Sequence, residues 1–576
     1  MRVALIPLNP TVADLDANAT AIASRARAAA DQGAGLIVLP ELALTGYPPR
    51  DLLLREDFLR ASERALERVA RELPDVPTLV GAPALDGDAV RNSLFLLARG
   101  RLEHRYDKRL LPGYSVFDEP RYFEPGETSP IIEVAGRRVG LTICEDLWKA
   151  ADVPGARRYH RQPDPLDALA GADLDLLVNV SASPFVLGKD ARQRRILESA
   201  ARRVGAPVLG VNQLGANDEL IFDGAAHVAL PPGAHGPEAR CLNAPRFEDR
   251  THLIDVGAAH HPGFAGEGED EHEEAALFSA LTLGIRDYAR KTGFSAAALG
   301  LSGGIDSALV AALAAAALGA SNVHALAMPS RYSSAGSVSD AREQARRLGL
   351  RLHEVPIREL HDAAERTLGP LFAAAGASSA PGIAEENVQS RLRGALVMAL
   401  ANKLHLLPLA TGNKSEMAVG YATLYGDMNG GLAPIADLSK TRVYALSRWI
   451  NARHADAGFS EPPIPDAVLS KAPSAELRPD QKDEDTLPPY DVLDAILDAL
   501  VDERAPVAEA ARRAGAPLEV AERVAGLLAR AEYKRRQMPP GLKVTREAFG
   551  IGRRLPIAKA WEATPAGDRA GGRPGP

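Results

Sequence analysis

The sequence is short of cysteine and of long apolar runs, and each shortage removes a class of protein. Only Cys144 and Cys241 occur in 576 residues. Two distant cysteines exclude a disulfide framework and a cysteine-rich zinc site, and they predict a reducing, cytoplasmic setting. The longest apolar run, Ala308–Leu318, is well short of the about 18 residues that mark a membrane span. We therefore expect no contact with a membrane.

Positive charge is also in short supply. Lysine and arginine number 67 against 75 aspartates and glutamates, which gives a formal net charge of −8. A protein with this balance is not built to hold a phosphate backbone, so no nucleic-acid partner is expected. The first residues, 1–7, have one charge and a very short apolar run, whereas a secretory signal needs about 7–15 apolar residues. This pattern also favours a cytoplasmic protein.

Strand-like apolar runs alternate with helix-like segments through the first part of the chain. The clearest are an apolar run at 3–8, a helical pattern at 17–32 that ends before Gly33, and a second apolar run at 36–39. Further strand-like runs lie at 78–81, 93–98, 138–143, 174–179 and 207–211. Such alternation predicts a layered α/β domain over residues 1–256.

The composition changes at 257–274, which is rich in Gly, His and Glu and has no apolar periodicity. We interpret this segment as an interdomain linker. His260, His261 and His272 could in principle bind a metal, but a solvated linker is the preferred interpretation. From residue 275 to 561, strands and helices alternate again in the rhythm of a parallel sheet with crossover helices. Residues 562–576, rich in Gly, Pro and Arg, are expected to be disordered.

Three reactive side chains stand where apolar runs of the first domain stop, namely Glu41, Lys108 and Cys144. Ligands of α/β folds bind at such strand ends. A thiol attacks an amide carbon only as the thiolate, so it needs a base, for which Glu41 is suited. Lys108 can stabilise the oxyanion that forms on the amide oxygen. The trio therefore suffices for hydrolysis of an amide.

Taken singly, each of these residues has a plainer interpretation. A cysteine at a strand end is most often a small buried apolar residue, and a lone Glu or Lys is usually solvated. Together, however, the segments around them resemble the signatures of the nitrilase superfamily over about residues 1–255. That resemblance implies an α-β-β-α sandwich with a Glu–Lys–Cys catalytic triad. The string at 108–126 is similar to the glutaminase domain of NAD synthetases, which implies that Glu119 is a second carboxylate near the triad.

The same resemblance implies a glutamine site made of Tyr114, Ser183 and Lys189. Some members of the family carry Arg at the position of Lys189. Both side chains are cations, but Arg offers a bidentate fork and Lys a point charge. Glu145, directly after Cys144, is interpreted as a partner for the ammonium group of glutamine.

The hexad SGGIDS at 302–307 joins an expected strand to an expected helix. Its glycines let the backbone approach a ligand, and amides at the start of the helix favour an anion such as pyrophosphate. A Gly-Gly turn can also serve packing alone, and the hexad is neither a Walker A loop nor GxGxxG. It resembles the pyrophosphate loop of the ATP-pyrophosphatase superfamily, which has a Rossmann-like parallel sheet. The resemblance implies that ATP is bound by Gly300, Leu301, Ser302, Gly303, Gly304, Ile305, Asp306 and Ser307.

Segments at 385–391, 411–416 and 471–479 then select among members of that superfamily. Taken singly, they are typical of a helix start, a turn and a charged loop, but in this order they resemble NAD synthetases. The resemblance implies that Thr411 contacts ATP, and it assigns deamido-NAD to Asn387, Glu416 and Lys534. It makes Glu416 a second Mg²⁺ ligand beside Asp306, and residues 471–489 a lid over the adenylate.

The family resemblance implies the reaction deamido-NAD + ATP + glutamine + water → NAD + AMP + pyrophosphate + glutamate. The expected small-molecule partners are thus L-glutamine, ATP and deamido-NAD, with Mg²⁺ accompanying ATP, and we expect a homo-oligomer. One alternative is a glutamine amidotransferase of the ATP-pyrophosphatase superfamily that acts on another carboxylate or nucleotide. Another is a non-catalytic binding protein that keeps the fold. The nitrilase-type segments argue against the first, and the intact reactive residues argue against the second.

Overall fold

The computed structural model describes residues 1–151, 156–233, 236–258, 261–266, 272–378, 380, 382–479 and 481–560. It divides into a first unit, Met1–Asp287, and a second unit that begins at Tyr288. The helix α4 (Glu273–Lys291) runs across this division. In the described part of the chain, no helix is both long and apolar enough to cross a membrane.

The first unit contains two six-stranded sheets. The first sheet has the order β14-β1-β2-β3-β4-β5. Its strands are β14 (His252–Asp255), β1 (Arg2–Leu5), β2 (Leu36–Val38), β3 (Thr78–Asp86), β4 (Ala89–Ala98) and β5 (Arg101–Asp107). The second sheet has the order β13-β12-β9-β8-β7-β6. Its strands are β13 (Arg240–Asn243), β12 (Ala226–Leu230), β9 (Val208–Asn212), β8 (Leu176–Ser181), β7 (Arg137–Ile143) and β6 (Ile131–Val134).

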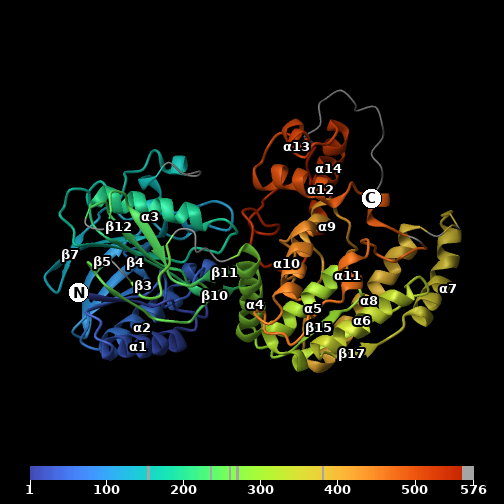
Figure 1. Ribbon diagram of the computed structural model, residues 1–576, viewed down its shortest axis with the longest axis horizontal. Helices are drawn as coiled ribbons and strands as arrows, with labels where there is room; N and C mark the ends of the chain where they lie inside the picture. Colours follow the sequence, from blue (N-terminus) through green and yellow to red (C-terminus); the bar gives the residue numbers. More distant parts are fainter. Residues whose placement is uncertain are drawn as a thin grey trace. The chain divides into compact units, whose positions relative to one another are not determined.

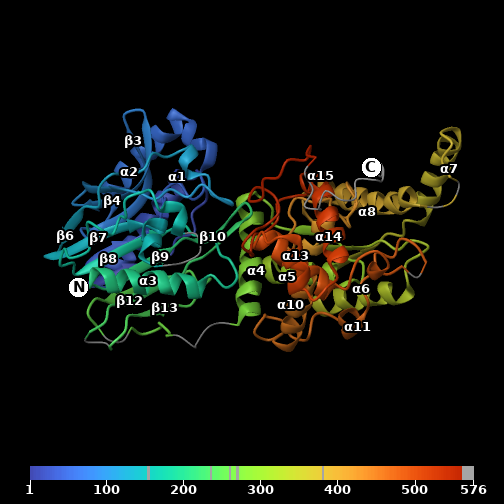
Figure 2. The same ribbon diagram turned by 90° about the horizontal axis from the view of Figure 1, so that it is seen from above.

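These sheets pack face to face, with helices on their outer faces. Between the sheets, side chains such as Leu5 and Val38 share one core with Leu141 and Val178. Figures 1 and 2 show α1 (Leu15–Asp31) and α2 (Glu56–Glu72) on one side of the two sheets and α3 (Asp190–Val204) on the other. Each helix turns a stripe of apolar residues at helical spacing toward its sheet. This is the α-β-β-α sandwich expected from the sequence.

Central strands of this sandwich are buried on both faces because helices cover one face and the other sheet covers the second. Every residue of β8 and β9, for example, is buried. Strands of this kind read as continuous apolar runs rather than as alternating patterns. The two central parallel pairs, β7 with β8 and β8 with β9, bring the ends of these strands to one edge of the sheet, where functional loops follow.

A parallel four-stranded sheet, in the order β17-β16-β15-β18, lies at the centre of the second unit. Its strands are β15 (Ala297–Gly300), β16 (Val323–Ala327), β17 (Arg351–Glu354) and β18 (Leu407–Leu409). The crossover helices include α5 (Ile305–Leu318), α6 (Ala335–Leu348) and α8 (Ile383–Leu404). The side chains of Val397 and Ala401 on α8 pack on Ala298 and Leu326 of the sheet. This is the Rossmann-like arrangement that the alternating pattern predicts.

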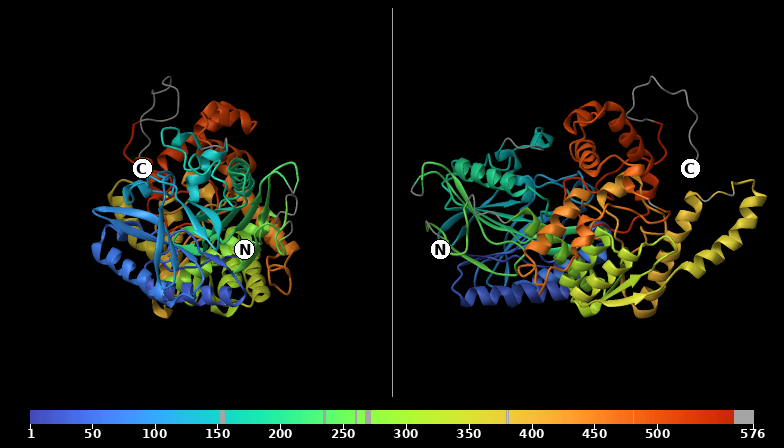
Figure 3. Two further views of the ribbon diagram at one scale, coloured as in Figure 1. Left: turned by 90° about the vertical axis from the view of Figure 1, so that its left-hand side faces the viewer. Right: turned by 45° about the vertical axis from the view of Figure 1, so that its right-hand side comes forward.

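Helices after the sheet complete the second unit. They include α9 (Lys414–Val419), α10 (Lys440–Ala452), α12 (Tyr490–Leu497), α14 (Leu518–Arg530) and α15 (Glu532–Arg535). Apolar residues of α9, α12 and α14 share a core of their own. The right-hand view of Figure 3 shows α7 (Arg358–Ala374) extending away from the sheet, and His361 is its one buried residue. The loops that follow β15 and β18 line a common space.

The predicted linker, 257–274, is described only in part. His260 and residues 267–271 lie outside the described residues, as does the predicted tail at 562–576. His261 is 3% exposed, and its ring packs on Phe264 with centroids 6.2 Å apart. Ala265 exchanges two backbone hydrogen bonds with Asn243 of β13. The expectation of a solvated segment is therefore wrong for His261, because this stretch adds to the edge of a sheet.

Candidate active sites

Cys144 lies where β7 ends and a short 3-10 helix, Cys144–Ala150, begins. Its backbone is left-handed, with φ of 49°. A residue other than glycine adopts this conformation at a cost, and such strain is common where a reactive side chain must be aimed. Asp146 stabilises the turn, because its Oδ2 accepts the backbone N–H of Ile143 at 2.9 Å.

Asp146 also fixes the loop that carries Lys108. Its Oδ1 accepts the backbone N–H groups of Arg109 at 3.0 Å and Leu110 at 2.8 Å. The hydroxyl of Tyr106 donates to Oδ2 at 2.7 Å. One buried carboxylate thus joins the end of β5 to the turn of the thiol. This residue was not predicted from the sequence, although it stands two positions after Cys144.

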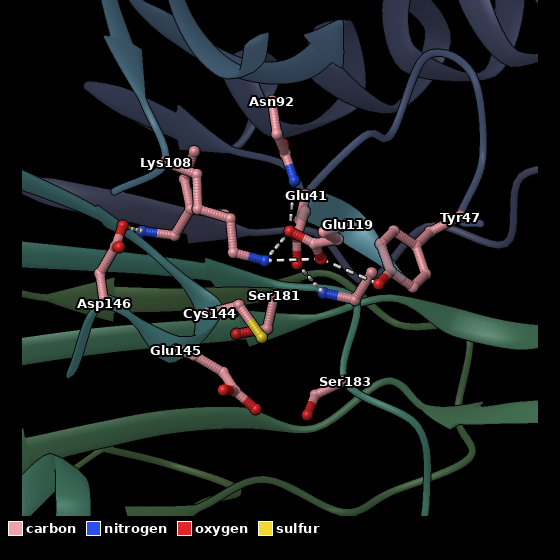
Figure 4. A network of polar contacts seen from close by, with 12 residues as sticks. Glu41, Tyr47, Asn92, Lys108, Glu119, Cys144, Glu145, Asp146, Ser181 and Ser183 are labelled. Carbon is pink, nitrogen blue, oxygen red and sulfur yellow. Dashed lines mark hydrogen bonds and ion pairs between the residues drawn. The ribbon is translucent and has the colours of Figure 1, made fainter. Parts of the chain in front are cut away.

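Glu41, Lys108 and Glu119 form a buried network of charges beside Cys144 (Figure 4). The Lys108 Nζ lies 2.7 Å from Glu41 Oε1 and 2.8 Å from Glu119 Oε1. The side chains of Glu41 and Lys108 are at most 1% exposed, and that of Glu119 is 4% exposed. Buried charges are tolerated when they are paired and hydrogen-bonded. The structure therefore brings the predicted triad and its supporting carboxylate together.

Neutral groups also donate hydrogen bonds to the carboxylates of Glu41 and Glu119. Asn92 Nδ2 donates to Glu41 Oε1 at 2.7 Å, and the backbone N–H of Ala182 donates to Glu41 Oε2 at 2.8 Å. The hydroxyl of Tyr47 donates to Glu119 Oε1 at 2.9 Å. These contacts orient the Glu41 carboxylate without using all of its lone pairs. Neither Asn92 nor Tyr47 was predicted from the sequence.

Burial and the neighbouring charges shift the pKa values of Cys144, Lys108 and Glu119. Burial raises the pKa of the Cys144 thiol, the negative charge of Glu41 raises it further, and Lys108 opposes both. The thiol therefore holds its proton at neutral pH and needs a base at the moment of attack. Burial alone would lower the pKa of Lys108, but the attraction of Glu119 and Glu41 raises it well above its usual value. Burial raises the pKa of Glu119 to about 7.

Of the predicted glutamine-binding residues, Ser183 and Lys189 share a small cavity with Cys144. The cavity has a volume of about 30 Å³ and is also lined by Trp148. Lys189 Nζ donates to Ser183 Oγ and to the carbonyl oxygen of Pro184, and burial lowers the pKa of Lys189. This volume holds little more than one water molecule. A ligand the size of an amino acid therefore fits only when side chains of the lining move apart.

Tyr114 and Glu145, the other two predicted positions, contact each other. The hydroxyl of Tyr114 donates to Glu145 Oε1, and that of Tyr159 donates to Oε2. Burial raises the pKa of Glu145. A carboxylate offers about four acceptor positions, so Glu145 can accept a further donor while both tyrosines stay in place. Tyr159 was not predicted, since its pairing with Glu145 depends on the fold of the intervening loop.

A cavity of about 480 Å³ opens in the second unit, a size that is usual for sites of small ligands. Every residue that the sequence assigned to ATP or deamido-NAD lines it. These residues are Gly300, Leu301, Ser302, Gly303, Gly304, Ile305, Asp306, Ser307, Asn387, Thr411, Glu416 and Lys534. Positions separated by more than 200 residues along the chain therefore face one space.

The hexad at 302–307 forms the floor of this cavity between β15 and α5. Gly303 has φ of 77°, and a Cβ there would meet the carbonyl oxygen of Ser337 at 2.3 Å, so only glycine fits. Gly304 precedes α5 and provides no side-chain cap. The first N–H groups of α5 are therefore available to an anion, with the dipole of a helix behind them. Ser302 and Ser307 hold the turn, their hydroxyls 3.1 Å apart.

Three charged side chains meet beside the hexad. Lys440 Nζ lies 2.6 Å from Asp306 Oδ2 and 3.0 Å from Glu416 Oε1. Asn413 adds a neutral link, since its Nδ2 donates to Asp306 Oδ1 at 2.9 Å and its Oδ1 caps α9 at the N–H of Glu416. Burial raises the pKa of Glu416 to about 8. Lys440 and Asn413 are functional-site residues that sequence reasoning missed.

The pair Asp306 and Glu416 was predicted to hold Mg²⁺, and its chemistry fits that ion. Both groups offer carboxylate oxygens, the ligands that Mg²⁺ prefers. Both line the cavity, and their side chains are 19% and 15% exposed. Among the described residues there is no cluster of three or more His, Cys, Asp or Glu suited to a metal. Two carboxylates suffice for Mg²⁺ when substrate phosphates and water complete its shell.

Asn387 and Lys534 both bind the loop that follows α9. Thr423 Oγ1 donates to Asn387 Oδ1 at 2.7 Å. Lys534 Nζ donates to the carbonyl oxygens of Gly420 and Ala422, both at 2.8 Å. Burial lowers the pKa of Lys534. The loop thus positions one amide and one cation from distant helices at the same wall of the cavity.

Two family models match the chain over nearly its whole length. The carbon-nitrogen hydrolase model matches residues 2–235, and the NAD synthase model matches residues 277–539. The first match contains the buried charge network and Cys144, and the second contains the cavity with the SGGIDS hexad. Fold and sites together thus define a carbon-nitrogen hydrolase domain joined to an NAD synthase domain.

Individual relatives cover the entire arrangement. The glutamine-dependent NAD(+) synthetase of Synechocystis sp. is 44% identical over 570 residues, which span 97% of this chain and 99% of that protein. The enzyme of Thermotoga maritima is 38% identical over 593 residues, 98% and 99% of the two chains. A solved structure of the Acinetobacter baumannii glutamine-dependent NAD+ synthetase, in complex with ADP, matches with a TM-score of 0.74 at 35% identity and covers 98% and 99%. The chain belongs to the family of glutamine-dependent NAD(+) synthetases.

Proposed function

We propose that the chain converts deamido-NAD, ATP, L-glutamine and water to NAD, AMP, pyrophosphate and glutamate. One observation carries the proposal. A chain with the buried Glu41–Lys108 pair beside Cys144 also holds the SGGIDS hexad in a cavity of about 480 Å³. The first arrangement suits release of ammonia from an amide, and the second suits activation of a carboxylate with ATP.

In the first half-reaction, Glu41 takes the proton of the Cys144 thiol as the sulfur attacks the amide carbon of glutamine. The Lys108 ammonium donates to the oxygen that becomes negative. Collapse of this intermediate breaks the carbon–nitrogen bond, and the proton on Glu41 passes to the departing ammonia. Water, deprotonated by Glu41, then attacks the thioester; glutamate leaves, and the proton on Glu41 returns to the Cys144 sulfur. Tyr114, Ser183, Lys189 and Glu145 are proposed to hold the substrate.

In the second half-reaction, ATP binds with its phosphates over the hexad at 302–307 and contacts Thr411. The nicotinate carboxylate of deamido-NAD attacks the α-phosphorus, and pyrophosphate leaves. Ammonia then attacks the carbonyl carbon of the adenylate, AMP leaves, and the surplus proton is released. Asn387, Glu416 and Lys534 are proposed to hold deamido-NAD.

Asp306 and Glu416 would hold Mg²⁺ in this site. When bound, the ion offsets the negative charge that grows on the departing pyrophosphate. Lys440, whose ammonium group contacts both carboxylates, offsets their mutual repulsion and holds them beside the cavity. We further expect a cytoplasmic homo-oligomer, with a glutaminase domain over residues 1–256 and a synthetase domain over residues 275–561.

The direct test is a product analysis by mass spectrometry. Wild-type protein is given ATP, Mg²⁺, deamido-NAD and glutamine labelled with ¹⁵N at the amide. The proposal predicts that NAD carries the label and that AMP forms in the same amount as NAD. Glutamate should form in at least that amount. Labelled product from a different carboxylate or nucleotide, with deamido-NAD unchanged, would instead establish the amidotransferase alternative.

A further inference from the structure

Asp494 is a buried carboxylate that contacts two helices bearing residues of the second cavity. It lies on α12 and is 3% exposed. Its Oδ1 accepts the hydroxyl of Ser415 on α9. Its Oδ2 accepts the backbone N–H and the hydroxyl of Thr441 on α10, at 2.9 and 2.8 Å. Every oxygen of this group is therefore used to join the first turns of α9 and α10.

Those first turns carry the charged residues of the cavity. Glu416 follows Ser415, and Lys440 precedes Thr441. The Ser415 hydroxyl also accepts the backbone N–H of Lys440 at 2.9 Å. One hydroxyl thus donates to Asp494 and accepts from Lys440, so the two helix starts cannot shift independently.

Asp494 also caps the first turn of α10, together with the Ser415 hydroxyl that accepts the N–H of Lys440. The residue before the helix, Ser439, makes no side-chain capping hydrogen bond. The Asp494 carboxylate, on α12, instead accepts the backbone N–H of Thr441 in the first turn of α10. A negative charge at the start of a helix is stabilised by the helix dipole. Its loss would therefore loosen the turn that holds Lys440.

Tyr490, one helical turn before Asp494, supports the same lysine from the side. Its ring centroid lies 5.2 Å from Lys440 Nζ, within reach of a cation–π contact. Its hydroxyl donates to Asp483 Oδ2 at 2.8 Å, and Asp483 lines the cavity. The face of α12 that bears Tyr490 and Asp494 is thus directed at the polar wall of the site.

We propose that Asp494 is a positioning residue for the ATP site. It fixes the starts of α9 and α10, and so holds Glu416 and Lys440 at the separation that places Mg²⁺ and the phosphates. Asp494 belongs to none of the described walls of the cavity, so it acts through these two residues. The proposal rests on the proposed function of that cavity.

The test uses Asp494→Asn, which keeps the volume but removes the charge and one acceptor. Glu547→Gln is the control, because Glu547 is a buried carboxylate of the same unit, accepts Arg504 Nη2 at 2.9 Å and lies outside the lining of the cavity. Thr441→Val, paired with Thr441→Ser, removes a single bond to Asp494 and serves if Asp494→Asn does not fold.

The first readout is the affinity of the full chain for Mn²⁺ in the presence of a non-hydrolysable ATP analogue. Electron paramagnetic resonance measures this affinity. The second is kcat and KM for ATP in NAD synthesis from ammonium. Residues behind a metal site typically change affinity by about 10–100-fold. We expect a loss in that range for Asp494→Asn, a smaller loss for Thr441→Val, and wild-type values for Thr441→Ser and Glu547→Gln.

The outcomes separate this proposal from the function on which it rests. Wild-type Mn²⁺ affinity and KM in Asp494→Asn, with only a lower thermal midpoint, would overturn the positioning role. An equal loss in Glu547→Gln would overturn it too, because the effect would then be general destabilisation. If wild-type protein binds Mn²⁺ with the analogue but makes no NAD, the proposed function fails, and the Mn²⁺ comparison still decides the role of Asp494.

Discussion

Replacing Lys108 by Met removes the one cation between two buried carboxylates and keeps nearly the same length of side chain. The wild-type Nζ lies 2.7 Å from Glu41 and 2.8 Å from Glu119, with all three groups at most 4% exposed. Removal of one partner from a buried ion pair costs about 3–5 kcal/mol, because a charge is left without compensation. The same change removes the proposed donor to the oxyanion, so glutaminase activity should fall by about 10²–10³-fold.

The stability loss should depend on pH in a defined direction. Glu119 already has a pKa of about 7 in the folded protein, above the value of about 4.3 for an unfolded glutamate. Without Lys108 this folded pKa rises further. A carboxyl group with a raised folded pKa contributes stability below its unfolded pKa and loses it as pH rises through the folded one. The difference between wild type and Lys108→Met should therefore widen from about pH 6 to above pH 8.

Hydrogen-exchange mass spectrometry in urea, followed on peptides from β5 and β7, measures this loss of stability within the first domain. A surface pair is the control, since Arg101 and Glu103 are 2.9 Å apart but 70% and 16% exposed. Arg101→Met should cost less than about 1 kcal/mol. Adding Glu119→Gln to Lys108→Met should restore part of the lost stability. A loss below about 1 kcal/mol for Lys108→Met, or one independent of pH, would refute the view of a buried charge network.

Three further predictions concern single residues. Glu41→Gln should lower glutamate release by about 10²–10⁴-fold because the base is lost, and release at the wild-type rate would make Glu41 structural. Asp306→Ala should abolish AMP and pyrophosphate formation while glutaminase persists, and AMP release near the wild-type rate would exclude its assignment. Burial lowers the pKa of His252 to about 4, so stability should fall by at most about 3 kcal/mol as pH drops from about 6.5 to 4. Thermal unfolding of His252→Phe should lack that slope, and an unchanged slope would assign it to other groups.

Strands that are covered on both faces could be predicted from the sequence, because burial demands continuous apolar residues. The run predicted at 174–179 overlaps β8, and that at 36–39 overlaps β2, with ends shifted by one or two residues. Short edge strands were missed. For example, β14 pairs with β1 through Asp255 and Arg2, and a pairing over such a distance leaves no local pattern. The helix α2 was not predicted either, although its apolar stripe at Leu59, Leu66 and Val69 is present in the sequence.

The candidate sites divide in the same way. Residues within contiguous motifs, such as Cys144 and the hexad at 302–307, could be found because neighbours in sequence carry the signal. Partners such as Asn92 and Lys440 could not, since each stands alone in its own segment and meets the site only through the fold. Asp494 is a further step removed, because it contacts the helix starts rather than the cavity.

The central claim is that one chain joins two separable chemistries, and the nitrogen source used by Cys144→Ala tests it most directly. Loss of one sulfur should leave only a small cavity and little loss of stability. We predict that the folded variant makes no NAD from glutamine but still makes NAD from ammonium, deamido-NAD and ATP, at a rate that rises with pH as free ammonia increases. NAD synthesis from glutamine by this variant would show that Cys144 is not the nucleophile and would contradict the account.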